Sequence, residues 1–132
     1  MTTDAFISEL CSTFGCDPDD GLSQGWIDTE DILLASSEIT RKNAARIIHM
    51  YLLKVCGISD LPMTGASVLR DLYDCRVCAN HVAQVYLRGI MEARDLKKNG
   101  GFLWFDLDGE DVDRGCIRRA FEVANGGSVK RI

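Results

Sequence analysis

The chain has 132 residues, a hydrophobic content of 46% and a formal net charge of -5, which is typical of one folded domain rather than of a disordered segment. The acidic balance argues against a general nucleic-acid binder, because phosphate backbones favour positively charged protein surfaces. No apolar run is long enough to span a membrane and residues 1–4 form no export signal, so we expect a cytoplasmic protein, or a cell-surface protein if an export signal has been removed.

Two stretches in the first half carry apolar residues at helical spacing, and each is predicted to be an amphipathic helix. The first follows Asp4, a candidate N-cap, and ends at Gly15. The second follows the N-cap candidate Thr40 and ends at Gly57. The two apolar stripes comprise Phe6, Ile7, Leu10, Cys11 and Phe14, and then Ala44, Ile47, Ile48, Tyr51, Leu52 and Val55.

Two further helices are predicted in the second half. The third stripe starts at Cys78, and the fourth ends at Asn125, just before Gly126 and Gly127. Pro62 and Gly65 indicate a connector between the second and third helices. The stripes comprise Cys78, Val82, Val85, Tyr86 and Ile90, and then Val112, Cys116, Ile117, Ala120, Phe121 and Ala124.

Long loops, residues 16–38 and 92–111, join the helices of each half. Loops of this length are uncommon unless they are anchored or functional. We expect the apolar runs 32–34 and 102–105 to fold back onto the helices as anchors. The alternative is that the runs are short strands that pair with one another.

The sequence therefore predicts a mainly α fold, with residues 1–132 forming a single domain. Within it, two helix–long loop–helix units, roughly residues 4–56 and 69–125, form an imperfect internal repeat. Arg41 and Arg114 occupy matching places in the two units, each directly after a candidate cap, Thr40 or Asp113.

A family resemblance follows from these motifs. The segment 37–41, Ser-Glu-Ile-Thr-Arg, resembles the Ile-Thr-Arg signature of bacterial S-layer homology domains, which opens the second helix of each repeat. Residues 69–91 resemble the opening half of such a repeat, and residues 105–114 its closing half, with Val-Asp-Arg at 112–114 in place of the signature. Leu33 stands where the family has an aromatic loop anchor. The chain departs from the family in having two units rather than three, and in lacking the Ala-Glu that usually follows the signature.

The resemblance implies a non-catalytic binding or scaffold domain whose ligand is an anionic cell-wall glycan, held by Thr40, Arg41, Asp113 and Arg114. Helix N-termini offer unpaired backbone N–H groups, and arginine adds a bidentate donor for carboxylate or phosphate. The simpler interpretation is that Thr40 and Asp113 only cap helices while the arginines pair with acidic loops. An alternative function is an intracellular protein-interaction module that has lost glycan binding, with an acidic protein surface as its partner.

A second alternative is a small zinc-binding regulator that uses Cys75, Cys78 and His81, since a two-residue gap between cysteines is common at zinc sites. A fourth ligand, Cys11, Cys16 or His49, would have to be supplied by the fold. Without an export signal, we expect the six cysteines to be reduced. In that case Cys78 is a core residue, and no cofactor is expected.

No catalytic motif is present, and the two histidines fall within amphipathic helices. The acidic run 106–113 fails the EF-hand pattern, because its sixth position is Asp111 rather than Gly. An acidic helix start explains this run. We therefore predict that the chain is not an enzyme.

Overall fold

The computed structural model describes residues 1–95 and 101–127, and its fold is mainly helical. Over these residues, the only β-type pairing consists of isolated bridges. In chain order the elements are α1 (Thr3–Phe14), η1 (Pro18–Asp20), α2 (Gly21–Gln24), α3 (Thr29–Leu33), α4 (Arg41–Lys54), η2 (Met63–Val68), η3 (Arg76–Cys78), α5 (Ala79–Leu87) and α6 (Gly115–Ala124), where η denotes a 3₁₀ helix.

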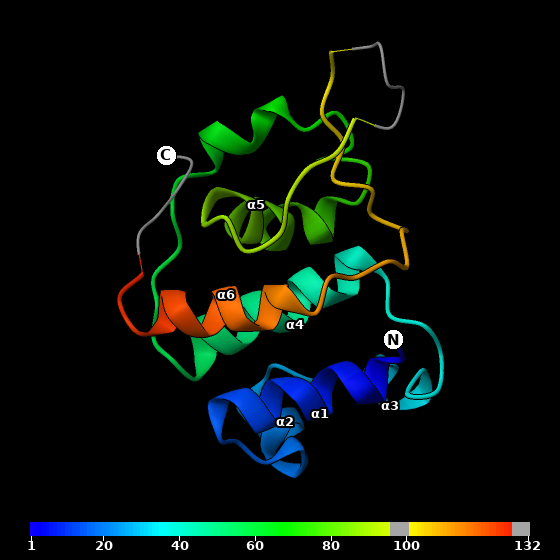
Figure 1. Cartoon of the computed structure of the whole chain (residues 1–132), viewed down its shortest axis with the longest axis vertical. Helices are drawn as coiled ribbons and strands as arrows, with labels where there is room; N and C mark the ends of the chain where they lie inside the picture. Colours follow the sequence, from blue (N-terminus) through cyan, green and yellow to red (C-terminus); the bar gives the residue numbers. More distant parts are fainter. Residues whose placement is uncertain (96–100, 128–132) are drawn as a thin grey trace.

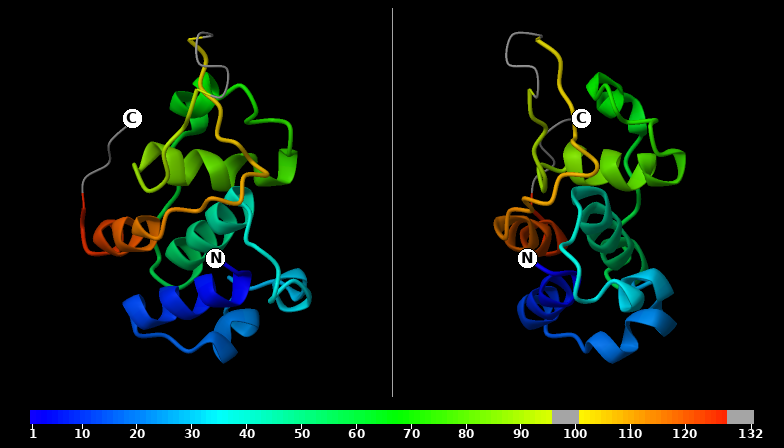
Figure 2. Two further views of the ribbon diagram at one scale, coloured as in Figure 1. Left: turned by 45° about the vertical axis from the view of Figure 1, so that its right-hand side comes forward. Right: turned by 90° about the vertical axis from the view of Figure 1, so that its right-hand side faces the viewer.

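The helices are stacked in three tiers (Figure 1). α1, with the short helices α2 and α3, forms one end, α4 and α6 lie together in the middle, and α5 lies at the other end beside η2. The same order of tiers is visible in the turned views (Figure 2). α4 contacts both α5 and α6, and α6 contacts α1, so the apolar stripes of all four long helices meet in one core.

α1 has the predicted apolar face, and Phe6 and Leu10 are fully buried. Its N-cap is Thr2 rather than the predicted Asp4, because the Thr2 side chain accepts a hydrogen bond from the Ala5 N–H. Asp4 instead lies in the first turn, where its charge favours the helix dipole. The predicted end at Gly15 is confirmed: this residue has φ 75°, a left-handed conformation that glycine adopts without strain.

α4 begins as predicted after Thr40, whose hydroxyl accepts from the Asn43 N–H. The helix ends at Lys54, slightly before Gly57, whose φ is 69°. Ile47 and Ile48 are buried at the centre of the molecule. α4 is therefore the helix around which the other tiers pack.

The two remaining predicted helices are shorter than their stripes. α5 starts at Ala79, after the 3₁₀ turn of η3, and α6 starts at Gly115. Val112 accordingly lies before α6, half-buried against the core. The predicted end of the fourth helix is confirmed, since Asn125 is its C-cap. The predicted connector is also partly helical, because it contains η2.

The expectation that residues 32–34 anchor the first loop is wrong. These residues lie in and just after α3, and Leu33 is 79% exposed. Trp26 and Ile27 fill the core instead, and the carboxylate of buried Asp31 pairs with Arg46. The capping hydrogen bonds and ion pairs of a short helix decide which of its sides faces solvent. The apolar run alone therefore did not predict which side of α3 is exposed.

The second loop is anchored by one residue of the run 102–105, because Phe105 is fully buried while Phe102 is 46% exposed. The alternative in which the two runs pair as strands is also wrong. Residues 103 and 104 form single bridges with Leu69 and Arg94 instead. Among the described residues, no helix combines the length and the apolar character needed to cross a bilayer.

Candidate functional site: an arginine-lined cavity beside the start of α4

The N-terminus of α4 lies against the second loop. The backbone N–H of Arg41 donates to the Gly109 carbonyl at 2.7 Å, and that of Lys42 donates to the Leu107 carbonyl at 2.9 Å. The Asn43 N–H donates to the Thr40 hydroxyl. The prediction that this helix start offers unpaired N–H groups to a ligand is therefore wrong, because the protein's own loop occupies them.

The Arg41 side chain lies in the interior, with only 4% of the residue exposed. Its Nε donates to the Phe105 carbonyl at 2.9 Å, its Nη2 donates to the Glu92 carbonyl, and its guanidinium lies 4.7 Å from the centre of the Phe105 ring. The simpler interpretation had the arginines pairing with acidic loops. The hydrogen bonds of Arg41 instead go to neutral carbonyl groups, and the carboxylates of Asp111 and Asp106 act on it through their charge.

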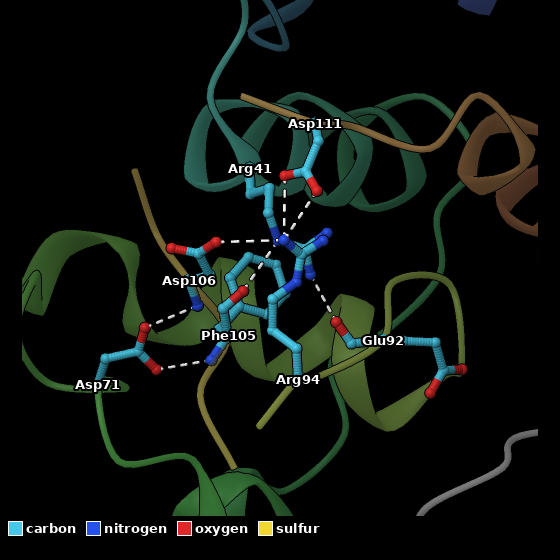
Figure 3. A network of polar contacts seen from close by, with 7 residues as sticks. All are labelled: Arg41, Asp71, Glu92, Arg94, Phe105, Asp106 and Asp111. Carbon is cyan, nitrogen blue, oxygen red and sulfur yellow. Dashed lines mark hydrogen bonds and ion pairs between the residues drawn. The ribbon is translucent and has the colours of Figure 1, made fainter. Parts of the chain in front are cut away.

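A buried carboxylate holds the loop against which Arg41 packs. The Asp71 oxygens accept from the N–H groups of Phe105 at 2.7 Å and Asp106 at 2.8 Å. Figure 3 shows the Asp71 carboxylate facing these two successive backbone N–H groups. Asp106 has φ 68°, the left-handed region that Asp tolerates better than most residues. Asp71 thus fixes the turn that places the Phe105 carbonyl at Arg41.

Arg94 enters the same region from the other side of the loop. Its Nη1 contacts Asp106 Oδ2 at 3.2 Å and Asp111 Oδ2 at 2.9 Å. The guanidinium groups of Arg41 and Arg94 converge beside the Phe105 ring (Figure 3). Burial and, secondly, the charge of Arg94 lower the pKa of Arg41 from its ordinary value. The hydrogen bond from Arg94 lowers the pKa of Asp111.

A cavity of about 180 Å³ opens between these arginines and the start of α6. Its lining includes three arginines, Arg41, Arg94 and Arg119. The carboxylates of its lining are those of Glu92 and Asp113. Of these, Asp113 accepts from Arg119 at 2.7 Å, and this hydrogen bond lowers its pKa. Arg119 also donates through Nε to the Ile90 carbonyl, which holds its side chain across the cavity.

Of the four predicted ligand-binding residues, Arg41 and Asp113 line the cavity, whereas Thr40 and Arg114 lie outside its lining. The Arg114 side chain is 70% exposed, and its Nε lies 3.8 Å from Glu9 Oε2. Asp113 does act at the start of α6, since its Oδ1 accepts from the Gly115 N–H at 2.9 Å. The sequence alone did not identify Arg94 or Arg119 as cavity residues. Matching the two repeats selects Arg114, directly after the candidate cap Asp113, rather than Arg119, which lies about a turn and a half later in the helix. Arg94 lies in the second loop and has no counterpart in the matched motifs.

The predicted zinc ligands are arranged differently. Cys75 and Cys78 form a disulfide, with their Cα atoms 5.2 Å apart, so the expectation of six reduced cysteines is wrong for this pair. The 3₁₀ turn of η3 brings the two Cα atoms within disulfide range. Cys11, Cys16, Cys56 and Cys116 are free thiols. Among the residues with described positions, no group of three or more His, Cys, Asp or Glu side chains is arranged to hold a metal.

His81 instead belongs to a chain of polar contacts. Its Nδ1 lies 2.7 Å from His49 Nδ1, and His49 Nε2 lies 2.6 Å from Asp60 Oδ1. Burial, then the charge of His49, lowers the pKa of His81 to about 4. Burial raises the pKa of Asp60, but hydrogen bonds from His49 and Asn80 outweigh it, so that pKa lies below its usual value.

No protein-family model, no curated protein and no solved structure matches the chain, so its function is inferred from the chemistry of these sites.

Proposed function

We propose that the chain is a non-catalytic binding domain that receives an anionic group, such as the carboxylate or phosphate of a cell-wall glycan, in the cavity lined by Arg41, Arg94 and Arg119. The observation that carries the proposal is that three arginines line one cavity. Planar, bidentate donors of this kind suit carboxylate and phosphate groups.

The charge of Arg41 gives the site its affinity for an anion. A buried charge is unfavourable unless a counter-charge offsets it. Arg94 already contacts Asp106 and Asp111, and Arg119 contacts Asp113, whereas the Arg41 side chain donates its hydrogen bonds to carbonyl oxygens. Asp111 and Asp106 stabilise its charge without an ion-pair contact. An anion in the cavity would add a counter-charge in direct contact.

The resemblance to S-layer homology domains supports the same ligand class. In this proposal residues 4–56 and 69–125 are two related units, and the arginine of the first signature, Arg41, lies in the cavity lining. In the second unit the cavity arginines are Arg94 and Arg119 rather than the signature arginine, Arg114. We propose that the second unit binds the anion through these two arginines.

Co-sedimentation with a purified acidic cell-wall polysaccharide tests the proposal. We expect the wild type to sediment with the polymer and to be released by salt, because the attraction is between charges. Arg94→Gln and Arg119→Gln should each weaken binding at least tenfold while the circular dichroism spectrum stays helical. The same polymer with its acidic groups removed should not bind.

Arg114→Gln and Arg118→Gln are the matched controls, since both side chains are more than two-thirds exposed and neither lines the cavity. Both should bind as the wild type does. Equal binding by all four variants, or no binding by the wild type, would refute the proposed ligand site.

A different observation favours a second function, protein interaction. A groove of about 350 Å³ runs among α1, η1, α2 and α3, with apolar side chains such as Leu22 and Ile32 exposed in it. Its rim is acidic, because residues 16–38 contain no Lys or Arg. A basic amphipathic segment with an apolar anchor fits this groove. That partner has the opposite charge to the acidic protein surface expected from the sequence.

Fluorescence anisotropy with a labelled basic amphipathic helical peptide tests the second function. Leu22→Glu should weaken binding at least tenfold, because it places a charge in the groove. Leu33→Glu is the control, since Leu33 is 79% exposed and outside the groove lining. Identical loss in both variants would indicate a general charge effect and would exclude the groove.

A further inference from the structure

The Cys75–Cys78 disulfide lies between two surface cavities. One, of about 420 Å³, is lined by both cysteines together with Val77 and His81. The other, of about 240 Å³, is lined by Cys75 and by Trp104. Cys75 therefore faces both cavities, and both cysteines are partly exposed. A disulfide with a purely structural role does not require a cavity on each side.

The surface around the bridge carries exposed apolar side chains among charged ones. Val77, between the two cysteines, is 85% exposed, and Tyr73 is 64% exposed. Neither side chain contributes to the core. Exposed apolar side chains that flank a reactive group are suited to docking an extended polypeptide segment.

The bridge also lies at the start of a helix. Cys78 is the N-cap of α5, where the positive end of the helix dipole stabilises a thiolate. Lys42 and Arg46 line the larger cavity beside the cysteines, but Asp28 and Glu30 line it too. Lys42 forms an ion pair with Asp108, and Arg46 forms ion pairs with Asp28 and Asp31. The charges of the lining are therefore balanced, and the helix start is the feature that favours a sulfur anion leaving from Cys78.

We propose that Cys75–Cys78 is an exchangeable disulfide that oxidises a dithiol in a polypeptide segment docked across Val77. This activity is independent of anion binding at Arg41.

The exchange balances without a further reactant. One thiolate of the segment attacks Cys75 Sγ; a bond forms between these sulfurs, the Cys75–Cys78 bond breaks, and the electron pair leaves on Cys78 Sγ. The second thiolate of the segment then attacks the segment's other sulfur, which is bonded to Cys75 in the mixed disulfide. This step forms the disulfide of the segment and releases Cys75. The segment loses two electrons and gains a disulfide, while Cys75 and Cys78 take up its two protons and become thiols.

A single-turnover experiment tests this proposal. The oxidised wild-type protein is mixed with a reduced synthetic peptide that carries two cysteines separated by two glycines, quenched with acid, alkylated and weighed by mass spectrometry. We expect about one equivalent of peptide disulfide per chain, with alkylation of Cys75 and Cys78, while the circular dichroism spectrum remains native. A bridge that opens only in urea would show that the disulfide is structural and would overturn the proposal. A preparation that contains one zinc per chain and no disulfide would overturn it as well.

Single variants identify the attacked sulfur. Cys78→Ser, mixed with the oxidised peptide, should form a mixed disulfide at Cys75 at least tenfold faster than Cys75→Ser forms one at Cys78. Cys16→Ser is the matched control and should exchange as the wild type does. Equal rates in the first two variants would refute the assignment of Cys75.

The docking part of the proposal has its own control. Val77→Glu should slow exchange with the peptide at least fivefold but leave the rate with dithiothreitol unchanged, because the small dithiol needs no docking surface. A Val77→Glu protein that reacts with both at wild-type rates would overturn the polypeptide as substrate.

Discussion

The guanidinium of Arg41 lies 4.7 Å from the centre of the Phe105 ring while its Nε donates to the carbonyl of the same residue. The two residues are 64 positions apart, and this hydrogen bond is buried. One arginine thus joins the start of α4 to the second loop through the ring and through the backbone. The same side chain then borders the cavity proposed to bind an anion.

Arg41→Ala should therefore lower the free energy of unfolding by about 3 kcal/mol, because it removes buried hydrogen bonds to the Phe105 and Glu92 carbonyls together with the ring contact. Urea denaturation followed by circular dichroism measures this change. Arg118→Ala is the control, since that side chain is 78% exposed and makes only a 4.0 Å contact with Glu122. Equal stability of the two variants would mean that Arg41 does not hold the loop.

Asp71→Asn should also destabilise the protein, by about 2 kcal/mol. Both Asp71 oxygens accept backbone N–H groups, and an amide would present a donor to one of them. Hydrogen exchange should become faster at the amides of Phe105 and Asp106 while exchange in α1 stays slow. Asp74→Asn is exposed and should leave both the stability and the exchange pattern unchanged.

The helical part of this fold could be predicted from the sequence because it depends on local information. Apolar spacing located all four long helices, and Thr40 and Gly15 marked ends that the structure confirms. The N-cap of α1 was displaced from Asp4 to Thr2, since either residue type can cap and only geometry decides between them.

The site could be predicted only in part, because it depends on contacts between distant segments. Arg41 was identified from its place after Thr40, but its burial results from a loop more than sixty residues away. Arg94 carries no local signal, and its role appears only when the loop folds back onto α4. The repeat pattern favoured Arg114, which the structure places in an exposed position.

Gly109 lies where a larger residue would crowd the Asp106 and Arg41 side chains. A Cβ there would lie 2.6 Å from Asp106 Oδ2 and 3.0 Å from Arg41 Cδ. Gly109→Ala should therefore destabilise the protein by about 1–3 kcal/mol and weaken anion binding, because it displaces the Arg41 side chain. Glu110→Ala, at the exposed neighbouring position, should change neither property. Thermal unfolding and the co-sedimentation assay measure both effects, and a stable, fully binding Gly109→Ala protein would contradict the close packing.

The contact between His49 and His81 leads us to expect that the folded protein is less stable in mild acid. Burial and the charges of His49 and Arg46 lower the pKa of His81 to about 4 in the folded protein, against the smaller opposing effects of Asp60 and Asp28. The unfolded chain, in which His81 titrates near its ordinary value of 6.5, therefore binds more protons than the folded protein between these two pH values. The folded state is favoured above this window, and its stability falls as the pH is lowered through it.

Urea titrations at pH 7 and pH 5 test this expectation. The wild type should unfold at a lower urea concentration at pH 5, and His81→Gln should show a smaller difference between the two pH values because it cannot take up the proton. Asn80→Ala is a useful comparison, since it removes a hydrogen bond to Asp60 but leaves the His49–His81 contact in place, and it should retain the wild-type difference over this window. If His81→Gln kept the full pH dependence, the destabilisation would have to come from another titrating group, and the partly buried contact between the two imidazoles would not be its source.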